Sequence, residues 1–146
     1  MVLNFRYHAI DGATNGLRKP TIPVEFKMNS GGYVEVMCLI DSGSDVIVLP
    51  KGLADLINLK IHEKSTSNGI GGEVPVDKGY ASFRIKKERG YHTFNAKVEV
   101  LHTDDIPVIL GRQGFFDRFK ITIDEKNKKV TLKEHSPKIS KKINKK

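Results

Sequence analysis

The tetrapeptide Asp41-Ser42-Gly43-Ser44 holds the residues of this sequence whose types and spacing are best suited to chemistry. It lies between an apolar stretch that ends at Ile40 and a second apolar stretch, Val46 to Leu49. Asp-Ser-Gly is a common turn sequence, so the segment predicts a carboxylate held in a tight loop between two buried strands. Such a carboxylate can transfer protons as a general acid or base, or it can bind a metal ion. The tripeptide alone does not separate these roles, because chance composition also produces it.

Two glycine-containing motifs follow and give the loop a context. Asn68-Gly69-Ile70-Gly71-Gly72-Glu73 is a glycine-rich tip between polar and strand-like stretches. It suits a mobile hairpin that closes over a ligand. Val108-Ile109-Leu110-Gly111-Arg112 is an apolar strand that ends in glycine and arginine.

In this order the three motifs resemble the retroviral proteases and their cellular relatives, the retropepsin-like aspartic proteases. The resemblance covers roughly residues 20 to 133. It implies a homodimeric aspartic endopeptidase that needs no cofactor and no metal and that cleaves polypeptides bound in an extended conformation. Water would be activated by two Asp41 carboxylates, one from each subunit, because the chain carries the Asp-Ser-Gly motif only once.

The resemblance also implies roles for the residues of the motifs. Asp41 would be the catalytic residue, Ser42 would link the two active-site loops across the dimer, and Gly43 would let the substrate backbone approach. Gly69, Ile70, Gly71 and Gly72 would form the flap tip. Asp45 and Arg112 match positions that pair, and would brace the active-site loop against the helix that follows.

The chain departs from the retroviral pattern at Ser44, where those enzymes usually carry alanine. A hydroxyl at this position is expected to donate to the Asp41 carboxylate and to shift the activity optimum toward acid. The longer N-terminal arm and the basic tail are further departures, and they bear on how the termini contribute to a dimer. Apolar residues near the motifs predict subsites for apolar side chains: Ile40, Val46, Ile47, Ile70, Val74, Val108 and Ile109.

Alternating apolar residues predict three β-hairpins along the chain. They join residues 22–28 to 34–40, 81–85 to 94–100, and 121–123 to 130–132. Helical signals are limited to two short segments, 51–57 and 113–119. The expected fold is therefore an all-β, mostly antiparallel domain, a retropepsin-like closed barrel or sandwich with one or two short helices.

At 146 residues the chain has the size of one domain. We expect an irregular N-terminal arm at 1–20, the protease-like domain at 21–133, and a disordered basic tail at 134–146. The net charge is +8, and residues 133–146 supply +5 of it. Because the tail lacks aromatic and arginine residues for stacking or base reading, no nucleic-acid partner is expected.

Composition also limits the environment of the protein. No apolar run is long enough to span a membrane, and the N-terminus lacks the pattern of a secretion signal. We therefore expect a soluble, cytoplasmic protein. Cys38 is the only cysteine, so no disulfide can form within the chain, and its apolar surroundings predict a core residue.

Three other functions remain to be weighed. A metal site could draw on Asp41, Asp45, His102, Asp104 and Asp105, although their spacing fits no zinc or calcium motif. Serine or cysteine hydrolysis lacks the local motif that would place a nucleophile. The third alternative is a retropepsin-like fold retained as a dimerisation or peptide-binding module without catalysis.

Overall fold

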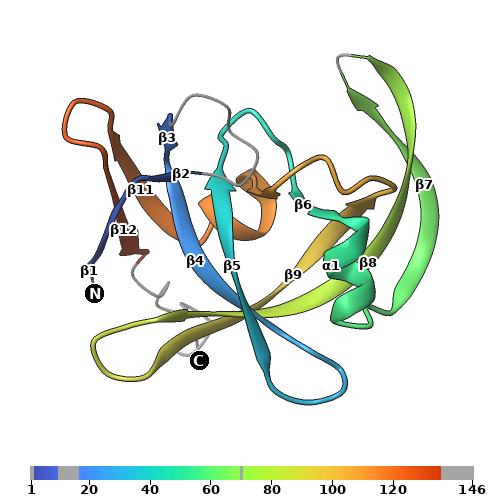
Figure 1. Ribbon diagram of the computed structural model, residues 1–146, viewed down its shortest axis with the longest axis horizontal. Helices are drawn as coiled ribbons and strands as arrows, with labels where there is room; N and C mark the ends of the chain where they lie inside the picture. The colour runs from blue at the N-terminus through green and yellow to red at the C-terminus, as the bar shows by residue number, and fades with distance from the viewer. Residues whose placement is uncertain (1, 10–16, 70, 136–146) are drawn as a thin grey trace, which may run out of the picture.

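The computed structural model describes residues 2–9, 17–69 and 71–135. Strands predominate in these residues, and the two helical segments are short (Figure 1). The elements follow in this order: β1 (Val2–Arg6), β2 (His8–Ala9), β3 (Arg18–Lys19), β4 (Thr21–Lys27), β5 (Tyr33–Ile40), β6 (Ile47–Pro50), α1 (Lys51–Leu56), β7 (Ile61–Gly69), β8 (Gly72–Lys86), β9 (Tyr91–Leu101), β10 (Val108–Leu110), η1 (Arg112–Phe116), β11 (Phe119–Asp124) and β12 (Lys129–Glu134).

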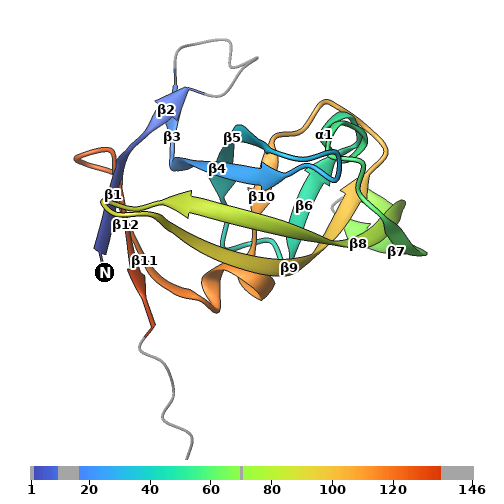
Figure 2. The same cartoon turned by 90° about the horizontal axis from the view of Figure 1, so that it is seen from below.

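The main sheet has the strand order β4-β5-β10-β6-β9-β8-β7, and a further pairing of β4 with β8 closes it into a barrel. Figure 2 shows β4 and β5 on one side of this barrel and β8 and β9 on the other. Most neighbours are antiparallel, while β10 runs parallel to β5 and β6 runs parallel to β9. The expected all-β, mostly antiparallel, closed fold is confirmed.

The three predicted hairpins are all present. In the first, β4 pairs with β5 from Thr21 opposite Leu39 to Lys27 opposite Tyr33. The second joins β8 to β9, and the third joins β11 to β12. Alternation predicted them because side chains two residues apart lie on the same face of a strand, and here one face of each strand is buried.

The N-terminal arm differs from the expectation of an irregular segment. Residues Val2–Arg6 form β1, which pairs antiparallel with β12, and β12 also pairs with β11. Leu3 and Phe5 pack against the core, and Tyr7 is buried. The prediction of an irregular arm was wrong for this part because burying these side chains stabilises the strand. Residues 10–16 lie outside the described residues.

The predicted C-terminal tail needs a smaller correction. Glu134 is the last residue of β12, and the main-chain N–H of His135 donates to the carbonyl oxygen of Arg118 at 3.2 Å. The remainder of the expected tail, residues 136–146, lies outside the described residues.

Both predicted helices have counterparts. The first, α1, agrees closely with the predicted range. The second is a single irregular turn, η1, because Gly114 has a φ of 96°, and Phe119 already begins β11. No helix in the described ranges is long and apolar enough to cross a membrane.

A cluster of aromatic rings fills the barrel where β4, β8, β9 and η1 meet. Phe83 lies 4.7 Å from Phe26 and 5.1 Å from Phe94, measured between ring centroids. Phe115 and Phe119 extend the cluster toward β11. Cys38 is fully buried, as predicted for a core residue, and burial raises the pKa of its thiol well above the ordinary value. The cluster fixes the barrel that carries the loop after β5.

Candidate active site

The active-site loop, residues 41–46, connects β5 to β6. Between these two strands lies β10, with Ile109 opposite both Leu39 of β5 and Val48 of β6. The main-chain N–H of Asp41 donates to the carbonyl oxygen of Leu110 at 3.1 Å. Asp41 is therefore fixed at the end of β5 by a strand that is distant in sequence.

Two short contacts orient Asp41 within the loop. The N–H of Gly43 donates to Oδ1 of Asp41 at 2.8 Å, and the N–H of Ser44 donates to the carbonyl oxygen of Asp41 at 3.2 Å. Asp41 is half-buried, whereas Ser42 and Gly43 are exposed. The loop thus presents an oriented carboxylate at the surface of the barrel.

The segment after β10 holds the far side of the loop. Main-chain N–H groups of Arg112 and Gln113 donate to the carbonyl oxygens of Ser44 and Asp45, each at 2.9 Å. This arrangement depends on Gly111, because a Cβ there would lie 2.1 Å from the carbonyl oxygen of Val46. The sequence showed Gly111 only as the residue that ends a strand, so its packing role was missed.

Asp45 and Arg112 are brought together, as the resemblance implied. A guanidinium nitrogen of Arg112 forms an ion pair with Oδ1 of Asp45. The side chain of Asp45 is 74% exposed and that of Arg112 is 59% exposed, and an exposed pair of this kind adds little to stability. The main-chain contacts from η1 therefore hold the loop more firmly than the ion pair does.

Ser44 does not make the contact expected of it. Its hydroxyl donates to the carbonyl oxygen of Val46 at 2.8 Å, and the Asp41 carboxylate is bonded to Gly43 instead. The expectation was wrong because a serine hydroxyl in a turn readily bonds to a main-chain acceptor two residues away. The physical reason for an acid-shifted optimum is thereby removed.

The glycine-rich tip lies at the end of the hairpin formed by β7 and β8. These strands pair from Ile61 opposite Gly79 to Gly69 opposite Gly72, and Gly72 has a φ of 104° that favours glycine. Gly71 is in the turn, and the predicted tip residue Ile70 lies outside the described residues. Figure 1 shows this hairpin extending away from the barrel on the side where α1 lies.

A buried carboxylate, Asp77, lies at the base of that hairpin. Its two oxygens lie 3.3 Å from Nζ of Lys64 on β7 and 3.1 Å from Nε2 of His102, which follows β9. Burial alone would raise the pKa of Asp77, but the hydrogen bonds from His102 and Lys64 outweigh it and hold the pKa below its ordinary value. Asp77 thus links three segments of the chain.

Apart from Ile70, which lies outside the described residues, the predicted subsite residues divide into two groups. Ile40, Ile47 and Val108 are buried in the core, so they cannot contact a ligand at the surface, and that part of the prediction was wrong. Val46, Val74 and Ile109 retain exposed surface. Each of these three buried residues is next in sequence to an apolar residue on the opposite face of its strand. These neighbours are Leu39, Val48 and Ile109.

Leu39, Ile109 and Val48 are opposite one another across β5, β10 and β6. All three are partly exposed, and Leu39 stands two residues before Asp41. The sequence analysis missed Leu39 and Val48 because every residue of these strands is apolar, and an unbroken apolar run does not reveal which face is buried.

The residues proposed for a metal site have other contacts or stand apart. Oδ1 of Asp104 accepts a hydrogen bond from the N–H of Gly52 at 2.6 Å, and His102 contacts Asp77. Within the described ranges, no group of three histidine, cysteine, aspartate or glutamate side chains is arranged to hold a metal ion.

Comparison with known proteins identifies the fold. The chain is similar to a retropepsin-like aspartic protease from Rickettsia conorii, with a TM-score of 0.58 and 20% identity over 90% of this chain and 91% of that one. The retroviral protease-like domain of Ddi1 from Leishmania major gives a TM-score of 0.48 and 18% identity, over 77% and 88% of the two chains.

The EIAV protease in complex with the inhibitor HBY-793 gives a TM-score of 0.40 and 24% identity, over 68% of this chain and 88% of that one. No protein-family model and no curated protein matches the chain. The match to the Rickettsia conorii protein shows that the chain has a retropepsin-like fold.

Proposed function

We propose that the protein is a homodimeric aspartic endopeptidase whose catalytic residue is Asp41. The observation that carries this proposal is the geometry of Asp41. Its carboxylate is half-buried at the end of β5, oriented by the N–H of Gly43 and attached through its own N–H to Leu110. A reactive carboxylate needs this combination of fixed orientation and access to a ligand.

The proposed chemistry uses two carboxylates that share one proton. The ionised carboxylate draws a proton from a water molecule, which attacks the carbonyl carbon of the scissile peptide bond. The protonated carboxylate donates a hydrogen bond to the carbonyl oxygen and stabilises the charge that develops there. The two groups titrate as a pair, because like charges at close range cannot both ionise readily.

A second copy of the chain would supply the second carboxylate. The Asp-Ser-Gly motif occurs once in the sequence, and Ser42 and Gly43 are exposed beside Asp41. A twofold axis close to this loop would bring two copies of Asp41 together and would allow Ser42 to link the loops. The exposed pair of Asp45 and Arg112 lies in the same region and would brace each loop.

The substrate of this proposal is an extended polypeptide with apolar side chains near the cleaved bond. The row formed by Leu39, Ile109 and Val48 offers partly exposed apolar surface beside Asp41. The hairpin of β7 and β8 would close over the bound chain, with its glycine tip, Gly69 to Gly72, nearest the substrate backbone.

The alternative is a binding or dimerisation module that performs no hydrolysis. It requires the same fold and the same dimer, and it differs only in turnover. The decisive experiment therefore measures cleavage of an unstructured peptide library from acid to neutral pH by the wild-type protein and by Asp41→Asn, with dimerisation followed by sedimentation.

We expect cleavage by the wild-type protein, inhibition by a statine-type compound, and loss of cleavage in Asp41→Asn with the dimer retained. Glu88→Gln, an exposed carboxyl in the β8–β9 turn, is the matched control and should cleave normally. A dimer that cuts no peptide in the library favours the binding module. Cleavage by a strictly monomeric species would contradict the proposed mechanism.

A further inference from the structure

In the part of the chain that the structure describes, one side of β5 has no neighbouring strand along most of its length. β4 pairs with β5 from Tyr33 to Leu39, whereas β10 pairs only with residues 38–40 on the other side. Among the described residues, no strand covers this second side at residues 33–37. An uncovered strand edge offers main-chain hydrogen-bonding groups to an extended peptide.

The direction of these main-chain groups follows from two hydrogen bonds near the end of β5. The N–H of Ile40 donates to Pro20, on the side of β4, and the N–H of Asp41 donates to Leu110 of β10. The main-chain groups of successive residues point to alternate sides of a strand. The N–H and carbonyl groups of Glu35 and the N–H of Met37 therefore point toward the uncovered side.

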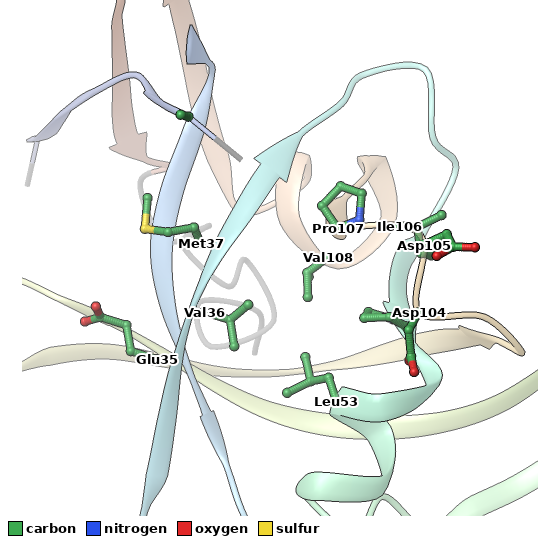
Figure 3. Close-up of a pocket in the computed structure, with 11 residues that line it drawn as sticks. Glu35, Val36, Met37, Leu53, Asp104, Asp105, Ile106, Pro107 and Val108 are labelled. Atoms are coloured by element: carbon green, nitrogen blue, oxygen red, sulfur yellow. The ribbon is translucent and has the colours of Figure 1, made fainter. Parts of the chain in front are cut away.

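A cavity of about 690 Å³ lies beside this edge. Figure 3 shows the side chain of Val36 directed toward Leu53 and Val108, while Glu35 and Met37 point to the opposite side of β5. The cavity is large enough for an apolar side chain of a bound peptide. Residues 41–46 and the hairpin of β7 and β8 do not line it.

Charge around the edge favours a cationic partner. Glu35 lies opposite Glu25 across β4 and β5, and two like charges in this position repel each other. Arg84 pairs with Glu25 at 2.8 Å, and Glu35 has no ion pair among the described residues. Asp104 and Asp105 add negative charge along the loop that borders the cavity.

We propose that the edge of β5 at residues 33–37 is a secondary docking site for an extended segment of the substrate polypeptide. The segment pairs with Glu35 and Met37 through its main chain. It places an apolar side chain in the cavity beside Val36 and Leu53, and a neighbouring lysine or arginine beside Glu35.

The position of this site relative to Asp41 defines its use. Met37 precedes Asp41 by four residues of extended chain, about 13 Å at the usual rise per residue. A polypeptide that binds both the edge of β5 and the loop of Asp41 is held more tightly than one that binds the loop alone. The identity of the ligand as substrate rests on the proposed function, whereas the docking site itself does not.

The test uses the full-length Asp41→Asn protein, in which hydrolysis cannot consume the probe. A fluorescein-labelled peptide, Lys-Val-Lys-Val-Lys-Val, is titrated with this protein and binding is read from fluorescence anisotropy. We expect Glu35→Lys to weaken binding about tenfold or more, because it replaces attraction with repulsion. Glu88→Lys makes the same charge change in an exposed turn and should leave the affinity unchanged.

A second measurement locates the peptide independently of charge. Hydrogen exchange at the N–H groups of Glu35 and Met37 should slow when the peptide binds, while a statine-type inhibitor should not displace the peptide. Equal loss of affinity in Glu35→Lys and Glu88→Lys, unchanged exchange at both amides, or displacement by the inhibitor would overturn the docking site. Loss of the protein dimer in Glu35→Lys would show instead that a second copy occupies this edge.

These outcomes are separate from those of the proposed function. If the wild-type protein cleaves nothing but the peptide binds as described, the protease proposal fails and the docking site stands as that of a binding module. If cleavage occurs but Glu35→Lys does not change the affinity for the peptide, the docking site fails and the protease proposal stands.

Discussion

The α-carbon of Gly111 lies so close to Val46 that a Cβ on Gly111 would be 2.1 Å from the Val46 carbonyl oxygen. The same hypothetical Cβ would lie 2.6 Å from the carbonyl oxygen of Ser44. Both contacts are to main-chain atoms of the active-site loop, which cannot rotate away as a side chain can. The end of β10 and the loop that carries Asp41 therefore pack as one unit.

Gly111→Ala is expected to destabilise the protein by about 3 kcal/mol, because the added methyl group forces the loop and β10 apart. The proposed protease activity should fall as well, since the loop positions Asp41. The measurements are the free energy of unfolding in urea and the cleavage rate.

Gly71→Ala is the control for this substitution, since a Cβ at Gly71 meets no atom within 4 Å among the described residues beyond its chain neighbours. Its free energy of unfolding should remain at the wild-type value. Equal stability of Gly111→Ala and the wild type would show that the loop can move away from β10 at little cost.

Ser44→Ala is expected to leave the pH optimum of cleavage unchanged. The hydroxyl donates to Val46 and does not contact the Asp41 carboxylate, so removing it does not alter the charged form of Asp41. The variant should lose about 1 kcal/mol of stability from the missing hydrogen bond. A pH-rate profile of the dimer that moves to higher pH would show that the hydroxyl turns to Asp41 in the active species.

Asp77 makes stability depend on pH at the acid end. Its folded-state pKa is below the ordinary value of 3.8, so its stabilising contribution is present above that pH and is lost as the pH falls through the lowered pKa. His102→Ala removes one of the donors that lower this pKa. The variant should therefore be less stable than the wild type near neutral pH and should lose less stability as the pH falls below about 4.

The free energy of unfolding, measured between about pH 2 and 6, tests this expectation. His8→Ala removes an exposed histidine far along the chain from Asp77 and is the matched control. Superimposable curves for His102→Ala and the wild type would show that the hydrogen bond from His102 contributes nothing to the ionisation of Asp77.

Deleting residues 1–7 is expected to destabilise the domain by about 3 kcal/mol. The deletion removes β1 and exposes one edge of β12, together with core contacts of Leu3, Phe5 and Tyr7. Deleting residues 136–146 removes a longer piece of chain and should leave the melting temperature unchanged. If the first deletion dissociates a dimer without lowering the melting temperature of the barrel, β1 belongs to an interface between subunits.

The hairpins could be predicted from the sequence because the two strands of each hairpin are neighbours along the chain. Ile22, Val24 and Phe26 alternate with half-exposed residues, and the strand that pairs with them begins six residues after β4 ends. β1 was missed because its partner strand is distant in the sequence, and five residues of alternation carry little signal alone. The contact of Gly111 with Val46 was missed for the same reason.

The candidate site was predicted in its residue types and less well in its contacts. Asp45 and Arg112 were expected to pair, and they do. The hydroxyl of Ser44 was expected to reach Asp41, but a nearer main-chain acceptor was available. Ile40 was chosen over Leu39 because both are apolar, and only the three-dimensional arrangement shows which of them faces the core.

The pairing of β1 with β12 has a consequence for the order in which the protein folds. Val2 lies opposite Lys133, so the contact joins residues separated by almost the whole described chain. Contacts between such distant residues close large loops and form slowly. During synthesis β1 emerges from the ribosome before the other strands of the domain, and its apolar side chains have no partner strand until residues 129–134 emerge. The barrel can assemble in that interval, but the domain is completed only after β12 has emerged.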